Sequence, residues 1–240
     1  LIPTFNGERF LRATIESALA QEFDDYEVVA VDDGSTDGTL EILRSFSDPK
    51  LRVFEKEHVG CVANYNRCLK EARGKYFAIL DHDDIMKPDR LAKQAAFLDK
   101  YQNVYIVGSR YDIIDENDNV IEGRPMPVGV HEVQKFELVF NAIQHPTAMY
   151  RKVLVDHIGG YEEEWFPSHD SEFILRALIQ YDGDNIPEPL TQWRRVKTSP
   201  TNRLYEEQRH QHYKMRKALN FRSYNVHVIR RRKQRYAMNL

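Results

Sequence analysis

The chain has 240 residues, of which 42% are hydrophobic and 30% are charged. This composition is typical of an ordinary folded domain and excludes a disordered or fibrous chain. The formal net charge of −3 gives no general argument for nucleic-acid binding, so no nucleic-acid partner is expected.

Strands and helices alternate through the first half of the chain. Short apolar or β-branched runs predict strands at 1–3, 26–33, 51–57 and 75–80. Apolar residues at helical spacing predict helices at 8–21, 39–46, 60–74 and 87–101. This alternation predicts a mostly parallel sheet covered by helices, and ligands of such sheets bind beyond the carboxyl ends of the strands.

The pattern changes from about residue 104. Strands are predicted at 104–115, 119–123 and 146–151, and helices at 131–143, 152–161 and 170–183. No repeat or low-complexity linker divides the chain. We therefore expect one two-part domain, followed by an increasingly basic helical segment at the C-terminus.

The two cysteines and the hydropathy of the chain bear on its compartment. Cys61 and Cys68 lie about two turns apart on one predicted helix, which is too far for a disulfide, so we expect reduced thiols and a cytoplasmic location. No apolar run reaches the ~20 residues of a membrane span. The opening "LIPTFNG" reads as the end of a strand, whose earlier residues we expect upstream of Leu1.

The segment "AILDHDDIMKP" gathers acids directly after an apolar strand. Asp81 and Asp83 alternate along an extended backbone, so their carboxylates point in similar directions. Paired carboxylate oxygens suit Mg²⁺ or Mn²⁺, which also accept phosphate oxygens. The alternative is that Asp83 or Asp84 caps the helix that begins near Pro88, which would explain only one acid.

A second acidic turn, "VDDGSTDG", follows another strand. Asp33 at this strand end can accept a hydrogen bond from a base N–H or a ribose hydroxyl, whereas the alternative is a solvated turn in which Asp37 caps the next helix. The chain has neither glycine-rich phosphate motif, so a cation must hold any diphosphate against the acids. This requirement points to a nucleoside diphosphate as the leaving group.

The segments "IPTFNGERFLRATIESALAQEFDDYEVVAVDDGSTDGT" and "GCVANYNRCLKEARGKYFAILDHDD" resemble family 2 glycosyltransferases of the GT-A fold. The resemblance implies a Rossmann-like α/β domain with a mixed, mostly parallel sheet and a C-terminal helical extension. It divides the chain into a nucleotide-binding half (1–103), an acceptor-binding half (104–202) and a basic extension (203–240). It also implies inverting transfer from a nucleotide-diphosphate sugar, commonly a UDP-sugar, to a saccharide or lipid-linked acceptor in bacterial polysaccharide or glycoconjugate assembly.

The resemblance assigns roles to residues of the first half. Asp83 takes the position of the metal ligand, with Mg²⁺ or Mn²⁺ as cofactor, and Asp84 that of a supporting acid. The expected nucleotide-binding residues are Pro3, Thr4, Phe5 (which stacks on the base), Asp33 (which reads the base) and Asp81 (which faces the ribose).

The catalytic base is expected in "GGYEEEWFPSHDSEFILRA", where Asp170 takes the place of the family's second acid and His169 replaces the first. The base would deprotonate the acceptor hydroxyl, and a single displacement would invert the anomeric carbon. The alternative for Asp170 is a helix N-cap. Three further carboxylates compete on the preceding loop: Glu162, Glu163 and Glu164.

The remaining candidates are contacts to the acceptor or the diphosphate. His145 is read as a structural or acceptor-lining residue rather than a metal ligand. Trp165 and Phe166 are candidates for stacking on an acceptor sugar or for packing of a mobile flap. The family often places an arginine and a histidine near the diphosphate, and here the cationic substitutes are Arg194, Arg195 and Lys197.

Two other functions stay open at this level: a catalytically silent sugar- or nucleotide-binding module and a nucleotidyltransferase, which usually carries a glycine- and lysine- or arginine-rich stretch that this chain lacks. The final "IRRRKQR" is a candidate for peripheral contact with anionic lipid at the inner face of the membrane, and a solvated basic helix end is the alternative.

Overall fold

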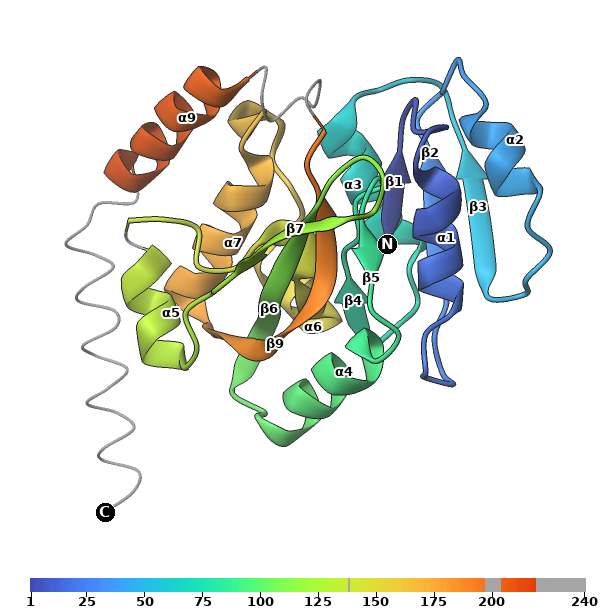
Figure 1. The fold of residues 1–240 in the computed structure, drawn as a ribbon. Helices are drawn as coiled ribbons and strands as arrows, with labels where there is room; N and C mark the ends of the chain where they lie inside the picture. The colour runs from blue at the N-terminus through green and yellow to red at the C-terminus, as the bar shows by residue number, and fades with distance from the viewer. Residues whose placement is uncertain (138, 197–203, 219–240) are drawn as a thin grey trace.

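The computed structural model describes residues 1–137, 139–196 and 204–218. Two sheets lie side by side and are covered by helices, as Figure 1 shows. The mixed α/β fold predicted from the alternating pattern is confirmed.

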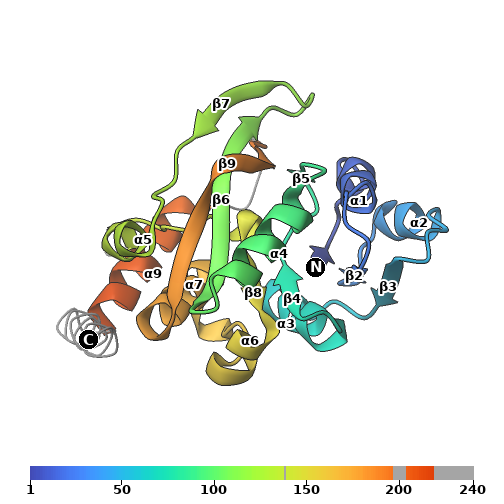
Figure 2. The same cartoon turned by 90° about the horizontal axis from the view of Figure 1, so that it is seen from below.

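The first sheet is parallel and carries the order β1-β2-β3. Its strands are β1 (Ile2–Thr4), β2 (Val28–Asp32) and β3 (Leu51–Glu55), and its helices are α1 (Leu11–Leu19), α2 (Thr39–Arg44) and α3 (Cys61–Glu71). Val28 and Ala30 pack with α1 and α2, whereas Val29 and Val31 pack with Cys68 of α3. The sheet is therefore covered on both faces, as Figure 2 shows.

The second sheet has the order β4-β8-β6-β9-β5, with β7 paired to β6. Its strands are β4 (Tyr76–Ala78), β5 (Ile85–Met86), β6 (Val104–Ile114), β7 (Val120–Arg124), β8 (Met149–Arg151) and β9 (Asp182–Arg194). Its helices are α4 (Arg90–Lys100), α5 (Val130–Glu137), α6 (Lys152–Ile158) and α7 (His169–Gln180), with 3₁₀ turns η1 (His145–Thr147) and η2 (Glu163–Trp165). Within this sheet the long strands β6 and β9 are parallel and the other pairs are antiparallel, so the second sheet is mixed.

Main-chain hydrogen bonds join the two sheets. The nitrogen of Leu1 donates to the carbonyl of Ala78 at 2.7 Å, and the nitrogen of Leu80 donates to the carbonyl of Leu1 at 3.1 Å. This spacing is the one found between parallel strands. As a result, the carboxyl ends of β1, β2 and the strand that begins with β4 open onto the same edge.

The long strand β9 is the main element that the sequence did not predict. It contains Pro187 and Pro189, and proline is depleted in central strands because it donates no ladder hydrogen bond. The pairing with β6 passes from Ile186 directly to Pro189, so Pro187 and Glu188 bulge out of the register and lie exposed. The bulge explains how this strand accepts proline between two neighbours.

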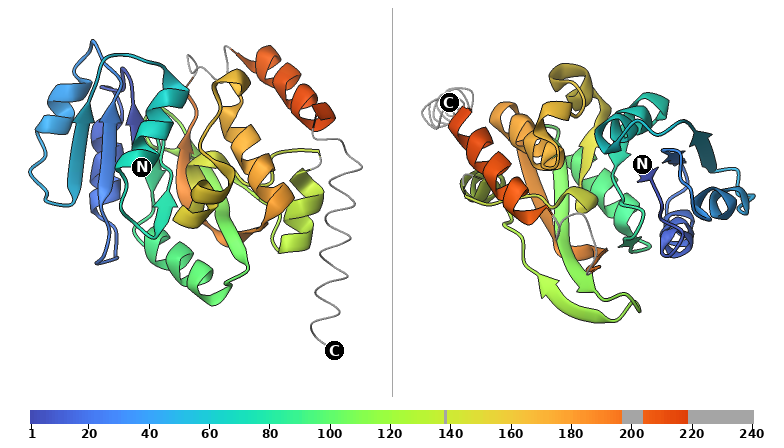
Figure 3. Two further views of the ribbon diagram at one scale, coloured as in Figure 1. Left: turned by 180° about the vertical axis from the view of Figure 1, so that it is seen from behind. Right: turned by 90° about the horizontal axis from the view of Figure 1, so that it is seen from above.

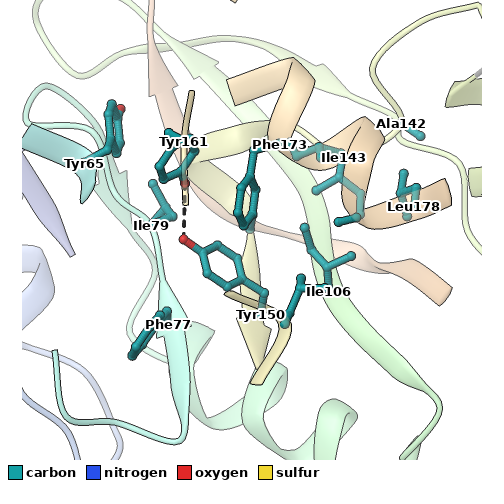
Figure 4. Packing of buried hydrophobic residues seen from close by; sticks show 14 of the residues in the cluster. Tyr65, Phe77, Ile79, Ile106, Ala142, Ile143, Tyr150, Tyr161, Phe173 and Leu178 are labelled. Carbon is teal, nitrogen blue, oxygen red and sulfur yellow. Dashed lines mark hydrogen bonds between the residues drawn. The ribbon is translucent and has the colours of Figure 1, made fainter. Parts of the chain in front are cut away.

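An aromatic core connects the two halves of the chain. Four aromatic side chains pack together, as Figure 4 shows: Tyr65 from α3, Tyr150 from β8, Tyr161 from the loop after α6, and Phe173 from α7. The hydroxyls of Tyr150 and Tyr161 lie 3.2 Å apart, so the buried oxygens satisfy one another. This core fixes α7 against α3.

The C-terminal helix α9 (Tyr205–Ala218) lies beside α7. The predicted boundary at 202, Lys197 and the "IRRRKQR" segment fall outside the described residues, and the division into halves stays a prediction. Across the ranges that the structure describes, no helix combines the length and apolar character needed to cross a membrane.

Gly108 in β6 permits a close approach that a methyl group would block. A Cβ at Gly108 would lie 2.8 Å from Cγ2 of Ile143 and still closer to the Asn185 side chain, whereas a Cβ at Gly123 in β7 would meet only Asp112 at 3.7 Å. We expect Gly108→Ala to lower the free energy of unfolding by about 2 kcal/mol, as overpacking does, and Gly123→Ala to change it by less than about 0.5 kcal/mol. Denaturant unfolding of both variants tests this, and equal stabilities would contradict the packing described for β6.

Candidate functional site

The carboxyl ends of β1 and β2 are held together by a polar network. Thr4 is buried, and its hydroxyl donates to the carbonyl of Val31 at 3.2 Å. The Asn64 amide from α3 donates to the carbonyls of Thr4 at 3.2 Å and Val31 at 3.0 Å. These bonds hold Thr4 beside the end of β2, from which the acidic turn begins.

Asp81 is held by a tyrosine that the sequence did not single out. The hydroxyl of Tyr65 donates to Oδ1 of Asp81 at 2.6 Å. Burial and the nearby Asp81 carboxylate raise the pKa of Tyr65 well above its usual value, so the hydroxyl remains a donor. The bond leaves the second oxygen of Asp81 for other partners.

The Asp83 carboxylate is in an environment that disfavours its charge. Burial, with Asp81 adding to it, raises the pKa of Asp83, and the neighbouring His82 and Arg194 offset only part of this shift. A divalent cation beside Asp83 would relieve this penalty, and the oxygen donors fit Mg²⁺ or Mn²⁺. Among the described residues no three acidic, histidine or cysteine side chains converge as a metal cage, so further oxygens must come from a ligand or water.

Arg194 is buried, and its side chain holds the backbone of the acidic loop, residues 81–84. Its side chain is 2% exposed, and its guanidinium donates to the carbonyls of Asp83 at 2.7 Å and Asp115 at 2.9 Å. Its main-chain N–H donates to Oδ1 of Asp84 at 2.7 Å. In this structure Arg194 is therefore a positioning residue, and the N-cap of α4 is Asp89 rather than Asp83 or Asp84.

Asp33 already has partners inside the chain. It is 1% exposed, and its carboxylate accepts the N–H groups of Val59 at 3.1 Å and Gly60 at 2.9 Å. Nδ1 of His58 lies 2.9 Å from the same carboxylate, and the His58 ring stacks on Phe5 with centroids 4.3 Å apart. The two residues expected to hold a base thus both contact the segment that leads into α3.

Asp170 lies in the first turn of α7 but does not cap it, because Ser168 is the N-cap residue. Burial raises the pKa of Asp170, but the neighbouring histidines, chiefly His169 and then His145, outweigh this and leave it below the usual value. Burial also lowers the pKa of His169, so this ring is neutral near pH 7. Asp170 is therefore an ionised carboxylate that can accept a proton.

Cys61, at the start of α3, lies among the acids of both halves. Its side chain is exposed at the surface, but desolvation by the surrounding protein, followed by the charges of Asp81, Asp170 and Asp33, raises the pKa of the thiol to about 12. Its Sγ lies 3.7 Å from Nε2 of His169, and neither cysteine forms a disulfide. Cys61 and Tyr65 are spaced i, i+4 on α3, and this spacing is the signal that could have predicted their shared position at the site.

The remaining candidates separate into buried and exposed groups. His145 is 5% exposed, and its Nε2 lies 2.7 Å from the Tyr161 hydroxyl. This contact is of the kind expected for a structural histidine. Phe166 is 44% exposed and stacks on His169, and Trp165 is half-buried beside it. The Arg195 guanidinium is partly exposed, 3.8 Å from Glu122. Of these, Phe166 contacts the ring of His169, the residue directly before Asp170.

The competing carboxylates on the loop before α7 do not converge with Asp170 in one hydrogen-bonded group. Glu162 lies 3.8 Å from the Arg176 guanidinium, and Glu163 and Glu164 lie in the turn η2, exposed.

A cavity of about 590 Å³ lies away from these acids. It is lined by residues at the amino ends of the strands, including Leu1, Val28 and Tyr76, and by none of the acids discussed here. Ligands of open α/β sheets bind at the opposite ends of the strands, so this cavity is not the candidate site.

Comparison with known proteins identifies relatives of this chain. The model of the family described as "Glycosyl transferase family 2" matches residues 1–159. An uncharacterized glycosyltransferase of Rickettsia typhi is 32% identical over 183 residues, covering 74% of this chain and 57% of the relative. An uncharacterized glycosyltransferase of Methanocaldococcus jannaschii is 29% identical over 201 residues, covering 81% and 69%. The chain thus spans little more than half the length of the Rickettsia typhi relative.

Solved structures show the same fold. The crystal structure of S. aureus TarS 1–349 in complex with UDP-GlcNAc has a TM-score of 0.69 at 23% identity, covering 82% of this chain and 58% of that one. The mannosyltransferase PcManGT from Pyrobaculum calidifontis in complex with GDP-Man and Mn²⁺ has a TM-score of 0.68 at 19% identity, covering 92% and 63%. These likenesses confirm the GT-A fold that the sequence predicted.

The buried position of Arg194 predicts that its substitution lowers the stability of the fold. Arg194→Met fills the space but leaves the carbonyls of Asp83 and Asp115 without their donor. We expect Arg194→Met to lower the free energy of unfolding by about 3 kcal/mol. Arg195→Met, at the partly exposed neighbour, should lower it by less than about 0.5 kcal/mol. Thermal and urea unfolding measure both. Unchanged stability in Arg194→Met would refute the positioning role.

Proposed function

The chain belongs to glycosyl transferase family 2, and from this premise we propose that it transfers a sugar from a UDP-sugar to an acceptor hydroxyl with inversion at the anomeric carbon. The observation that carries the proposal is the position of Tyr65, whose hydroxyl donates to Asp81 at 2.6 Å while its ring lies 5.4 Å from that of His169, the residue directly before Asp170. Acids of the donor half and the candidate base of the second half therefore border one space.

The donor is proposed from the acidic turn and from the structural relatives. Asp33 and Phe5 match family positions that hold the base, commonly uracil. TarS is described with UDP-GlcNAc and PcManGT with GDP-Man, so nucleotide sugars occupy proteins of this fold. We take the transferred group to be a hexosyl or N-acetylhexosaminyl unit. Because Asp33 now binds the amides of Val59 and Gly60, the base would bind beside this carboxylate or displace part of that segment.

Asp83 is the proposed ligand of Mg²⁺ or Mn²⁺, and Asp81 faces the ribose. The bound cation would neutralise the charge that grows on the departing diphosphate. Tyr65 holds Asp81 in one orientation, and Arg194 fixes the backbone that carries Asp83. These contacts hold the acidic loop in place before a donor arrives, which lowers the cost of binding.

Asp170 is the proposed base. Its carboxylate removes the proton of the acceptor hydroxyl as that oxygen attacks the anomeric carbon on the face opposite the leaving group. A single attack from that face inverts the configuration, and no covalent nucleophile is required. The exposed ring of Phe166 and the half-buried Trp165 beside Asp170 are suited to stacking on a saccharide or lipid-linked acceptor of bacterial polysaccharide or glycoconjugate assembly.

Nucleotide titration tests the donor site. We expect UDP, rather than GDP, CDP or ADP, to bind in calorimetry with Mn²⁺ and to lose binding with EDTA. Loss of a residue that only supports a metal ligand weakens metal binding by roughly 10- to 100-fold. Asp83→Asn removes the proposed ligand itself, so it should weaken metal-dependent UDP binding by more than this. The distant Asp89→Asn is the control and should leave UDP binding unchanged. Absence of binding by every diphosphate would instead favour the silent module.

Substitution of the base tests the chemistry separately. Asp170→Asn should retain UDP binding and reduce transfer by about 100- to 10,000-fold, the range of general base catalysis. The pKa of Asp170 lies below its usual value, so the wild-type base stays ionised, and its protonation should cause no loss of rate above about pH 5. Glu164→Gln, on the preceding turn, is the control. Full transfer by Asp170→Asn, or its loss in Glu164→Gln, would move the base elsewhere.

A further inference from the structure

One face of α9 lies on the segment that leads into Asp170. Gln208, Gln211, His212 and Met215 are buried or half-buried and follow the i, i+3, i+4, i+7 spacing of one helical face. The other described side chains of the helix, among them His210 and Tyr213, are exposed. Figure 3 shows α9 beside α7 from two directions.

The contacts of this face reach residues just before the base. The Gln208 amide donates to the carbonyl of Pro167 at 3.4 Å, and the Gln211 amide donates to the carbonyl of Phe166 at 3.5 Å. The hydroxyl of Ser168 donates to the carbonyl of Gln208 at 3.5 Å. These hydrogen bonds are long and therefore weak. Together with the buried side chain of Met215, they dock α9 in one position on residues 166–168.

His212 enters a hydrogen-bond group that ends on the base. Its Nε2 lies 3.0 Å from the buried hydroxyl of Ser171, which also accepts the Asn141 amide at 2.8 Å. That hydroxyl donates to Oδ1 of Asp170 at 3.4 Å.

The donor and acceptor capacity of the hydroxyl decides the direction of these bonds. A serine hydroxyl has two lone pairs and one hydrogen. Asn141 fills one lone pair, and an Nε2–H of His212 fills the other, so the hydrogen is left for Asp170. An unprotonated Nε2 would instead draw this hydrogen away from the carboxylate. All the bonds of Ser171 are satisfied together only when His212 donates.

We propose that α9 is part of the active site and that His212 is a positioning residue, which acts through Ser171 to hold the Asp170 carboxylate in place. The catalytic consequence rests on the proposed function, in which Asp170 is the base. The family model ends at residue 159, so the helix lies outside the matched part of the chain. The hydrogen bonds of α9 described above reach residues 166–171, so we expect its effect to fall on transfer and not on nucleotide binding.

Variants of the full chain test this role. We expect His212→Ala to lower kcat about 5- to 10-fold, the value of one hydrogen bond, with the donor KM and the UDP affinity unchanged. His212→Gln, whose amide N–H can donate to Ser171, should recover most of kcat. His210→Ala, the same change on the exposed face of α9, is the matched control and should behave as wild type. Equal kcat in His212→Ala and His210→Ala, or no recovery with glutamine, would overturn the proposal.

Hydrogen exchange of the same variants gives a readout that needs no activity. The amides of Phe166 and of residues 168–172 should exchange about fivefold faster in His212→Ala than in His210→Ala, whereas those of β2 should not change. If the wild-type protein binds no nucleotide and transfers no sugar, the proposed function fails. The exchange difference between the two variants then decides by itself whether α9 stabilises residues 166–172. Equal exchange in the two variants overturns this stabilising role.

Discussion

The structure depends on how buried negative charge is balanced at one edge of the sheets. Asp33 and Asp84 are buried and Asp83 is half-buried, and burial of carboxylates costs free energy unless each has a partner. The partners come from distant parts of the chain: main-chain amides before α3 for Asp33, and the end of β9 for the acidic loop. The charge that prepares the site for a cation therefore also ties its segments together.

This constraint connects the two halves of the chain. Arg194 reaches the acidic loop from the far end of β9, and Tyr65 reaches Asp81 from α3 while its ring contacts His169 beside the candidate base. A shift of α7 would therefore disturb the packing of the residue that orients Asp81. Binding at the acidic loop and the position of Asp170 share one aromatic contact, and the site behaves as a single packed unit.

The sequence predicted the acids but not their partners, for a physical reason. An acid that follows a buried strand can be read locally, because the apolar run, its end and the charge are neighbours in the chain. Tyr65 and Arg194 act through contacts made across the fold, and a tyrosine in an amphipathic helix carries no local signal of the carboxylate that it meets. The sequence predicts a diphosphate contact for Arg194, since its burial depends on the strand β9, and the prolines in that segment argue against a strand.

The bulge in β9 has a consequence for how this site can vary. The strand begins two residues after α7, which carries Asp170, and ends at Arg194, which holds the acidic loop. Pro187 and Glu188 are unpaired and exposed, so one residue gained or lost there would leave the ladder on either side intact. Each such residue would change the size of the bulge, while Arg194 keeps its pairing with Ile114 of β6 and its place at the acidic loop. The bulge is thus a place where the strand can gain or lose length while the geometry between the acidic loop and Asp170 is preserved.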